Sequence, residues 1–365
     1  MKLLYWKGGA MFPVLKIGDL EVEMPIIQGG MGVGISLSGL ASAVANEGGI
    51  GVIATPDIGM DEPDFLTNFI EANRRALRKE IRKARELSKG IIGVNVMMAL
   101  TNGMDLIRTA IEEEIDVIFL GAGFLRDPRQ FIIKGMKTKI IPIVSSARVA
   151  EIIVKNWDIH EYLPDAVVTE GPKAGGHLGF KKDQINDPEY ALEKIVPEVI
   201  EILGPYKKNG RPIPIIAAGG VFTGADIHKF LQLGAAGVQM ATRFVATHEC
   251  DADIRFKEAY INAKESDIVI IKSPVGMPGR AIRNNFLDEV SNGNKKPIRC
   301  PFKCLTPCKV ESAPYCISFA LMNAKKGNLP RGFAFAGANA YRVNEIVSVN
   351  EVFASLRKEY EDAEK

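Results

Sequence analysis

The sequence predicts an α/β fold: a (β/α)8 TIM barrel with a smaller helical cap and a Cys-rich loop. Short runs rich in Val and Ile, bounded by Gly or Pro, alternate with longer stretches of helical spacing, which is typical of βα units around a parallel sheet. We count eight such runs, and eight strands close a barrel. After each run the chain turns through Gly, Asn, Ser or Thr, as it does where barrel enzymes keep their chemistry. A doubly wound open sheet is the structural alternative.

The expected elements follow one another along the chain. A long helical stretch, forming one helix or two, is expected over 62–87, and an amphipathic helix over 346–358 closes the chain. Further helices are expected over 38–47, 188–203, 224–233 and 251–264. The eight expected strands are 25–28, 50–54, 91–96, 116–120, 140–144, 165–169, 214–217 and 236–240.

Composition favours a globular protein with a small-molecule partner. The chain has 365 residues, of which 47% are hydrophobic and 25% charged, so a packed core is expected. Its 46 Lys and Arg residues nearly balance 44 Asp and Glu residues, which gives no reason to expect nucleic acid or an anionic membrane as a partner. No apolar run reaches the roughly 18 residues of a membrane-spanning helix. We therefore expect a cytoplasmic protein, with a homodimer as a candidate assembly.

Three loops that follow expected strands are candidates for holding a ligand, and the first two of them are rich in glycine. Gln28 to Gly34 (QGGMGVG) follows the first, Ala217 to Gly224 the seventh, and Gln239 to Phe244 the eighth. Loops after strands seven and eight of such a barrel, with free backbone N–H groups at a helix start, form the usual phosphate site. The pair of loops therefore predicts a phosphorylated cofactor.

One histidine lies among glycines directly after an expected strand, in TEGPKAGGHLGF, residues 169–180. Glycines around His177 indicate a loop whose backbone approaches a ligand closely. An imidazole with an ordinary pKa of about 6.5 can take or give a proton near neutrality. His177 is therefore the candidate catalytic residue.

Four of the five cysteines are gathered in residues 300–316, with the spacing C-x3-C-x3-C-x7-C. Such clustering in a cytosolic protein favours metal or redox chemistry over disulfides. Zn or a [4Fe–4S] cluster, two local disulfides, and free buried thiols are the alternatives. The candidate ligands are Cys300, Cys304, Cys308 and Cys316.

Six motifs together resemble the nitronate monooxygenase family, once called 2-nitropropane dioxygenases. The resemblance covers roughly residues 15 to 287, and related flavin enzymes include enoyl-acyl-carrier-protein reductases and NAD(P)H:quinone reductases. It implies FMN on a TIM barrel. The motifs are QGGMGVG (28–34), GVNVM (93–97), EGPKAGGHLGF (170–180), AAGGV (217–221), QMATRF (239–244) and SPVGMPGR (273–280).

The same resemblance implies residue roles. His177 would lie at the substrate face of the flavin. Glu170, where relatives often have Gln, and Gly175 would face the ribityl chain. The other implied FMN contacts are Gly29, Gly30 and Met31 along the ring, Asn95 as a hydrogen-bonding group, and Gly219, Gly220, Gln239, Met240, Ala241 and Thr242 at the phosphate.

The resemblance implies an FMN-dependent oxidoreductase, with oxidation of alkyl nitronates or nitroalkanes by O2 as the leading activity. An NAD(P)H-dependent enoyl-acyl-carrier-protein reductase or a quinone reductase is the alternative, and NAD(P)H would then be the reductant. A flavin or cluster electron carrier or sensor is the alternative of another class. We expect an FMN-binding barrel over 12–245, a cap over 246–330 and a C-terminal segment, 331–365, that folds back on the barrel.

Overall fold

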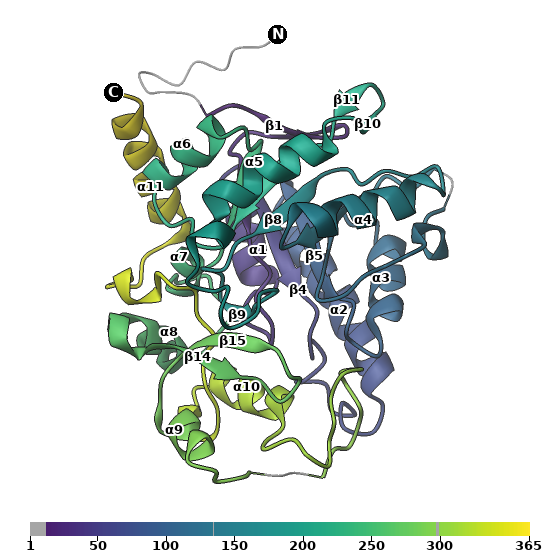
Figure 1. Ribbon diagram of the computed structural model, residues 1–365. Helices are drawn as coiled ribbons and strands as arrows, with labels where there is room; N and C mark the ends of the chain where they lie inside the picture. The colour runs from purple at the N-terminus through teal and green to yellow at the C-terminus, as the bar shows by residue number, and fades with distance from the viewer. Residues whose placement is uncertain (1–11, 134, 297–298) are drawn as a thin grey trace.

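The computed structural model describes residues 12–133, 135–296 and 299–365. In these residues eight parallel strands form a closed barrel surrounded by helices (Figure 1). Closure is completed by the pairing of the last strand with the first, with Val238 opposite Ile26. The strands are β3 (Ile26–Gln28), β4 (Ile50–Ala54), β5 (Ile91–Met97), β6 (Val117–Gly121), β7 (Lys139–Val144), β8 (Val167–Glu170), β12 (Ile215–Ala218) and β13 (Gly237–Met240).

The barrel prediction is confirmed and the open-sheet alternative is wrong. Every expected strand is present, and its ends differ from the expected ends by at most two residues. The strands are buried on both faces, as the near-continuous apolar runs predict for a parallel sheet covered by helices.

The helices expected from the sequence are present, although their ends differ from the expected ones. The stretch expected over 62–87 is one helix, α2 (Phe69–Leu87), preceded by turns in which the Gly59 N–H donates to Asn73 Oδ1 at 2.9 Å. The remaining outer helices are α1 (Ser38–Asn46), α3 (Gly103–Glu112), α4 (Ala147–Asp158), α5 (Leu192–Leu203), α6 (Gly224–Gln232), α7 (Thr242–Val245) and α11 (Val349–Glu364). Three of these helices, α3, α4 and α7, were not predicted.

The two ends of the barrel differ. At the amino-terminal end an antiparallel hairpin, β1 (Leu15–Ile17) and β2 (Leu20–Val22), packs Leu15 and Ile17 against inward-facing residues such as Phe119 and Ile216. This end is therefore filled by apolar side chains. The opposite end, where the strands finish, is left for the site.

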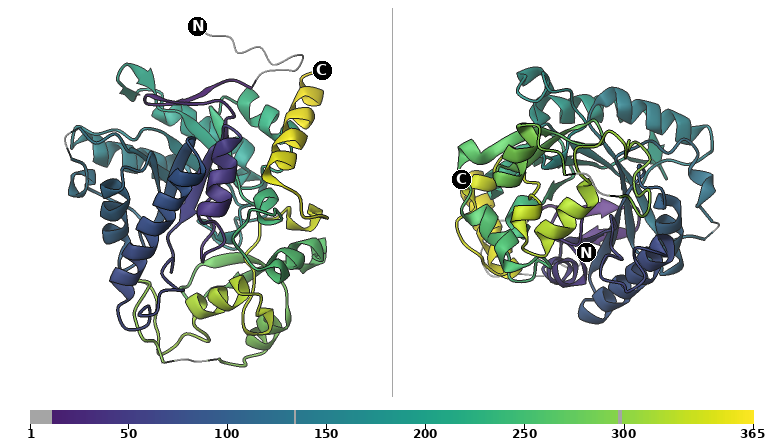
Figure 2. Two further views of the ribbon diagram at one scale, coloured as in Figure 1. Left: turned by 180° about the vertical axis from the view of Figure 1, so that it is seen from behind. Right: turned by 90° about the horizontal axis from the view of Figure 1, so that it is seen from below.

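A smaller layer covers that second end (Figures 1 and 2). It contains α8 (Ile254–Ile261), α9 (Asn285–Ser291), α10 (Ile317–Lys325) and two strands, β14 (Ile268–Lys272) and β15 (Pro278–Ile282). These strands form a three-stranded antiparallel sheet with β9 (Gly176–His177), which comes from the barrel loop after β8. The cap is therefore not purely helical, since β15 pairs with a two-residue strand from another part of the chain.

The last helix returns to the barrel wall. The middle of α11 packs so closely on the start of α6 that a Cβ at Gly224 would lie 2.2 Å from the Leu356 carbonyl oxygen. Only glycine permits that approach. Among the helices of the described residues, none has the length and apolar character needed to cross a bilayer.

Candidate active site

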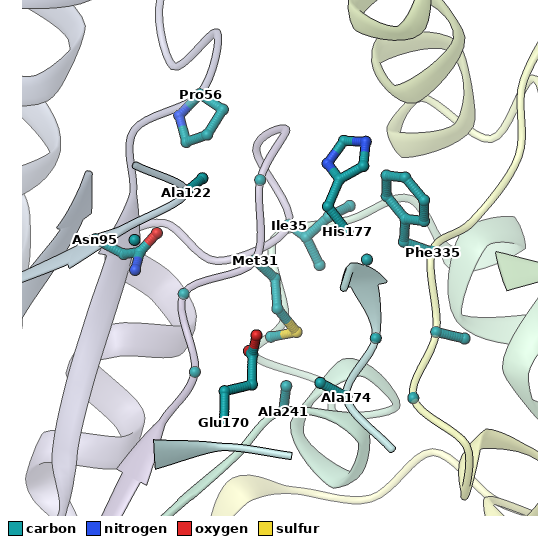
Figure 3. Close-up of a pocket in the computed structure, with 18 of the residues that line it drawn as sticks. Met31, Ile35, Pro56, Asn95, Ala122, Glu170, Ala174, His177, Ala241 and Phe335 are labelled. Atoms are coloured by element: carbon teal, nitrogen blue, oxygen red, sulfur yellow. The ribbon is translucent and has the colours of Figure 1, made fainter. Parts of the chain in front are cut away.

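A cavity of about 300 Å³ lies between the strand ends and the cap. Its barrel side comes from the loops after β3, β4, β5, β8, β12 and β13, and its cap side from β9, α10 and residues 335–339. Figure 3 shows side chains from both sides directed into one space. This is the position where barrels of this architecture carry their active sites.

All the predicted cofactor and catalytic residues line this cavity. Segments that lie far apart in the sequence therefore meet at one end of the barrel, as expected for loops that follow parallel strands. The lining includes His177, Gly29, Gly30, Met31, Asn95, Glu170, Gly175, Gly219, Gly220, Gln239, Met240, Ala241 and Thr242. Their contacts with a cofactor stay a prediction.

The loop after β12 presents backbone donors to the cavity. Gly219 and Gly220 have φ of +88° and +108°, and a Cβ at Gly219 would lie 2.6 Å from the Gly171 carbonyl oxygen. Both the left-handed conformation and the close approach require glycine. Within the described parts of the chain, the N–H groups of Gly220 and Val221 have no protein acceptor. They are therefore available to an anionic group, as at other phosphate-binding turns.

Glu170 carries a half-buried carboxyl at the end of β8. Its side chain points into the cavity (Figure 3). Burial alone raises the pKa of Glu170 to about 7 from its usual 4.5, because desolvation disfavours the charged form. Glu170 can therefore be a hydrogen-bond donor near neutral pH, as the Gln expected in relatives would be at every pH.

His177 faces the cavity from β9, with its strand paired to Gly279 of β15. Its Nε2 lies 2.7 Å from Ser273 Oγ, and its ring meets the edge of Phe335 at a centroid distance of 5.1 Å (Figure 3). Burial lowers the pKa of His177 to about 4. At neutral pH the imidazole is therefore uncharged and is held in one orientation from the cap side.

Three further residues shape the site and were not predicted from the sequence. Ser273, which is only 2% exposed, orients His177 across 96 residues of chain. The buried Arg280 guanidinium donates to the carbonyls of Pro172 (2.7 Å) and Ala174 (2.5 Å), and so fixes the loop that leads to His177. Ser273 and Arg280 both belong to the motif SPVGMPGR (273–280), but the residues to which they hydrogen-bond can be identified only from the fold.

Asp57 is the third of these residues. It is 5% exposed, has a left-handed φ of +51° and accepts a hydrogen bond from Ser318 of the cap helix α10. Its second oxygen, Oδ1, has no partner among the described residues. Burial raises the pKa of Asp57 to about 6. Asp57 therefore joins the barrel to the cap at the cavity wall.

The cysteine cluster lies at the edge of the cap, and Cys304 lines the cavity. All five cysteines are free thiols, so the alternative of two local disulfides is not found. Within residues 12–133, 135–296 and 299–365, no three His, Cys, Asp or Glu side chains are arranged to hold a metal ion. The predicted metal site at Cys300, Cys304, Cys308 and Cys316 is thus not formed by these side chains as they stand.

Comparison with known proteins places the chain in a family. The sequence model of the family described as nitronate monooxygenase matches residues 14–359. A probable nitronate monooxygenase of Staphylococcus aureus strain MRSA252 is 29% identical over 359 residues, 91% of this chain and 96% of the relative. One from strain MSSA476 is 29% identical over 297 residues, 74% of this chain and 79% of the relative.

Solved structures give the same fold. The structure of FabK from Thermotoga maritima is 29% identical, with a TM-score of 0.71 over 93% of this chain and 94% of the other. Nitroalkane oxidase from Streptomyces ansochromogenes, at 21% identity and a TM-score of 0.68, matches in fold over 93% of this chain and 96% of the other. The match to the family over most of the chain, together with the barrel and its lined cavity, confirms that this protein belongs to the nitronate monooxygenase family of oxidoreductases.

Proposed function

We propose that this chain is an FMN-dependent oxidoreductase that oxidises alkyl nitronates, and more slowly nitroalkanes, with O2. The observation that carries the proposal is the placement of His177 across the cavity from the glycine-lined strand ends. The membership in the nitronate monooxygenase family supports it.

The residues present are compatible with FMN. The free N–H groups of Gly220 and Val221 suit the phosphate, and the adjoining Thr242 hydroxyl adds a donor at the same end of the cavity. Glu170 and Asn95 supply polar groups further along the cavity (Figure 3). Bound FMN would supply the electron-accepting chemistry, and the protein supplies binding, orientation and exclusion of water.

His177 suits an anionic substrate. The uncharged imidazole can donate a hydrogen bond to a nitronate oxygen, with Ser273 holding the ring in place. A neutral nitroalkane must first lose its α-proton, and an imidazole whose pKa is about 4 is a weak base for that step. We therefore propose that preformed nitronates react faster than the corresponding nitroalkanes.

Anaerobic mixing of the purified flavoprotein with propyl-2-nitronate tests the proposal. The flavin absorbance should bleach within the time of one turnover, and bleaching by NADPH alone should be far slower. Bleaching by NADPH with no response to the nitronate would contradict nitronate oxidation.

An NAD(P)H-dependent enoyl-acyl-carrier-protein reductase or quinone reductase is the second candidate. It is favoured by the match to FabK from Thermotoga maritima, which is as strong in identity as the matches to the curated relatives. In this reaction His177 would polarise or protonate the substrate. Rapid bleaching by NADPH, followed by reoxidation with an enoyl thioester or a quinone, identifies this activity.

A further inference from the structure

The segment Cys300–Cys316 is closed and pinned against the barrel. The Lys296 N–H donates a hydrogen bond to the Pro314 carbonyl at 2.7 Å, which brings the chain just before the segment close to the C-terminal part of the segment. Its middle pairs with the loop after β5, because the Thr101 N–H donates to the Cys304 carbonyl at 3.0 Å and the Thr306 N–H donates to Ala99 at 2.9 Å. The four cysteines therefore belong to a fixed loop.

Aromatic packing holds the same loop to the outer helices. Phe302, between the first two cysteines, stacks on Phe69 of α2 at a centroid distance of 4.2 Å and meets the edge of Phe65 at 4.9 Å. The loop thus has its own apolar anchor, and the cysteines are not needed as packing residues.

The four thiols are near one another. Burial, then the Asp57 carboxylate, and then the nearby thiols of Cys316, Cys300 and Cys308 raise the pKa of Cys304. Cys304 is buried at the cavity wall, while Cys300, Cys308 and Cys316 are half-buried around it. Three half-buried thiols and one buried thiol therefore belong to one loop.

Basic residues predominate in and around the loop. Residues 295–311 contain five basic residues and one acidic residue. Cys316 is the N-cap residue of α10; burial raises the pKa of its thiol, and the nearby backbone N–H groups of Phe319 and Ser318 act in the opposite direction. Helix N-termini and basic neighbours stabilise thiolates, and hydrogen bonds to sulfur are among the features that set the potential of iron–sulfur clusters.

We propose that Cys300, Cys304, Cys308 and Cys316 bind a [4Fe–4S] cluster in the wall of the flavin cavity. Four cysteine thiolates are the ligand set of such a cluster. A single zinc ion would draw its sulfurs to about 3.8 Å from one another, given Zn–S bonds of about 2.3 Å, and the described side chains have no such convergence. A cluster bonds its ligands at four separate iron atoms and so spans sulfurs that lie further apart.

The position gives the cluster a function. Cys304 lines the cavity, as do Ile317 and Ser318, which directly follow Cys316. A reduced cluster next to bound FMN passes one electron to it and returns to its oxidised state. Two such transfers with two protons from solvent reduce the flavin fully, and a one-electron donor protein of the ferredoxin type replenishes the cluster. This electron route rests on the proposed FMN site, whereas cluster binding does not.

Metal analysis of the anaerobically purified protein, reconstituted with ferrous iron and sulfide, tests the proposal. We expect about four iron and four acid-labile sulfide per chain, with absorbance near 400 nm and a dithionite-dependent electron paramagnetic resonance signal. Wild-type protein with no sulfide, with zinc alone, or with the cysteines in disulfides would overturn the proposal.

Serine variants locate the cluster. Cys304→Ser and the half-buried Cys308→Ser should lose most of the iron and sulfide, while Cys250→Ser, at the fifth cysteine, should retain both. Flavin content and circular dichroism report whether each variant has folded. Iron and sulfide retained in folded Cys304→Ser and Cys308→Ser would overturn the assignment. A cluster in protein that binds no FMN would support the cluster and refute only the flavin site.

Discussion

His177 could be predicted as a site residue from its immediate neighbours, whereas the group that orients it could not. Its flanking glycines and the preceding strand are local features of the sequence. Ser273 reaches Nε2 only because β9 pairs with β15 in the cap sheet. Likewise the raised pKa of Glu170 depends on burial by segments distant in sequence. Local sequence identifies the chemical groups, and tertiary packing determines their protonation.

Replacement of His177 tests its catalytic role. In His177→Ala the turnover of nitronate should fall on the order of 100-fold or more, because a positioned proton-handling or hydrogen-bonding group is lost. The FMN absorbance should remain, since His177 is not in the expected phosphate or ring contacts. His160→Ala, in the turn after α4, is the matched control and should turn over at the wild-type rate. Equal rates for both variants would remove His177 from the mechanism.

Glu170 makes stability depend on pH. Its carboxyl has a pKa of about 7 in the folded protein against about 4.5 ordinarily. Between pH 4.5 and 7, Glu170 keeps a proton in the folded protein that it releases in the unfolded chain. The free energy of unfolding therefore falls as the pH rises through this range, and the contribution of the protonated carboxyl is lost above about pH 7.

Glu170→Gln mimics the protonated acid. Its free energy of unfolding should exceed that of the wild type by an amount that grows from pH 4.5 to 7 and then stays constant, on the order of 1–3 kcal/mol. Urea unfolding of the flavin-free proteins at pH 5 and pH 8 measures this. The same difference at both pH values would contradict a Glu170 carboxyl with a raised pKa.

Among the elements, strands were predicted best, because a buried parallel strand such as β4 is an uninterrupted apolar run between turn residues. β9 was not predicted, since a two-residue strand carries no periodicity and exists through its pairing with β15. The ends of the helices were predicted less accurately than the ends of the strands. The helix expected over 251–264 begins only at Ile254, where the Asp253 carboxylate accepts from the Arg255 N–H at 2.9 Å.

The first turn of α1 depends on a residue that is more than 200 positions away in the sequence. Its N-cap, Leu37, has no capping side chain, and the Asp251 carboxylate instead accepts from the N–H groups of Leu37 (2.7 Å) and Leu40 (3.2 Å). Asp251→Ala should therefore lower the free energy of unfolding by about 2 kcal/mol. Asp362→Ala, on the exposed end of α11, should change it by less than about 0.5 kcal/mol. Equal urea midpoints for the two variants would show that Asp251 is not a cap.

The turn after β12 should tolerate no side chain at Gly219. Gly219→Ala combines a φ of +88° with a contact of 2.6 Å to the Gly171 carbonyl oxygen. Gly293→Ala is the matched control, since Gly293 has a φ of +89° and open space around it. We expect Gly219→Ala to cost at least about 1 kcal/mol more in urea unfolding, because only it adds the steric overlap to the strain. Equal costs would refute the close approach.

At the scale of the whole molecule, one end of the barrel is filled and the other is functional. The β1–β2 hairpin packs into the amino-terminal end, and the cap encloses a cavity at the opposite end. The sequence predicted which loops would meet there, because the carboxyl ends of parallel strands share one face. It could not predict how the cap closes over them, since Ser318 of α10 meets Asp57 across 261 residues.

The central claim is that the strand-end loops of this barrel bind FMN through its phosphate. Titration of the flavin-free protein with FMN and with riboflavin, followed by flavin fluorescence, tests it most directly. We expect one FMN per chain and an affinity about 100-fold or more above that for riboflavin, since two free N–H groups each gain a charge-assisted hydrogen bond. Equal affinity for the two flavins, or no binding of either, would contradict the account.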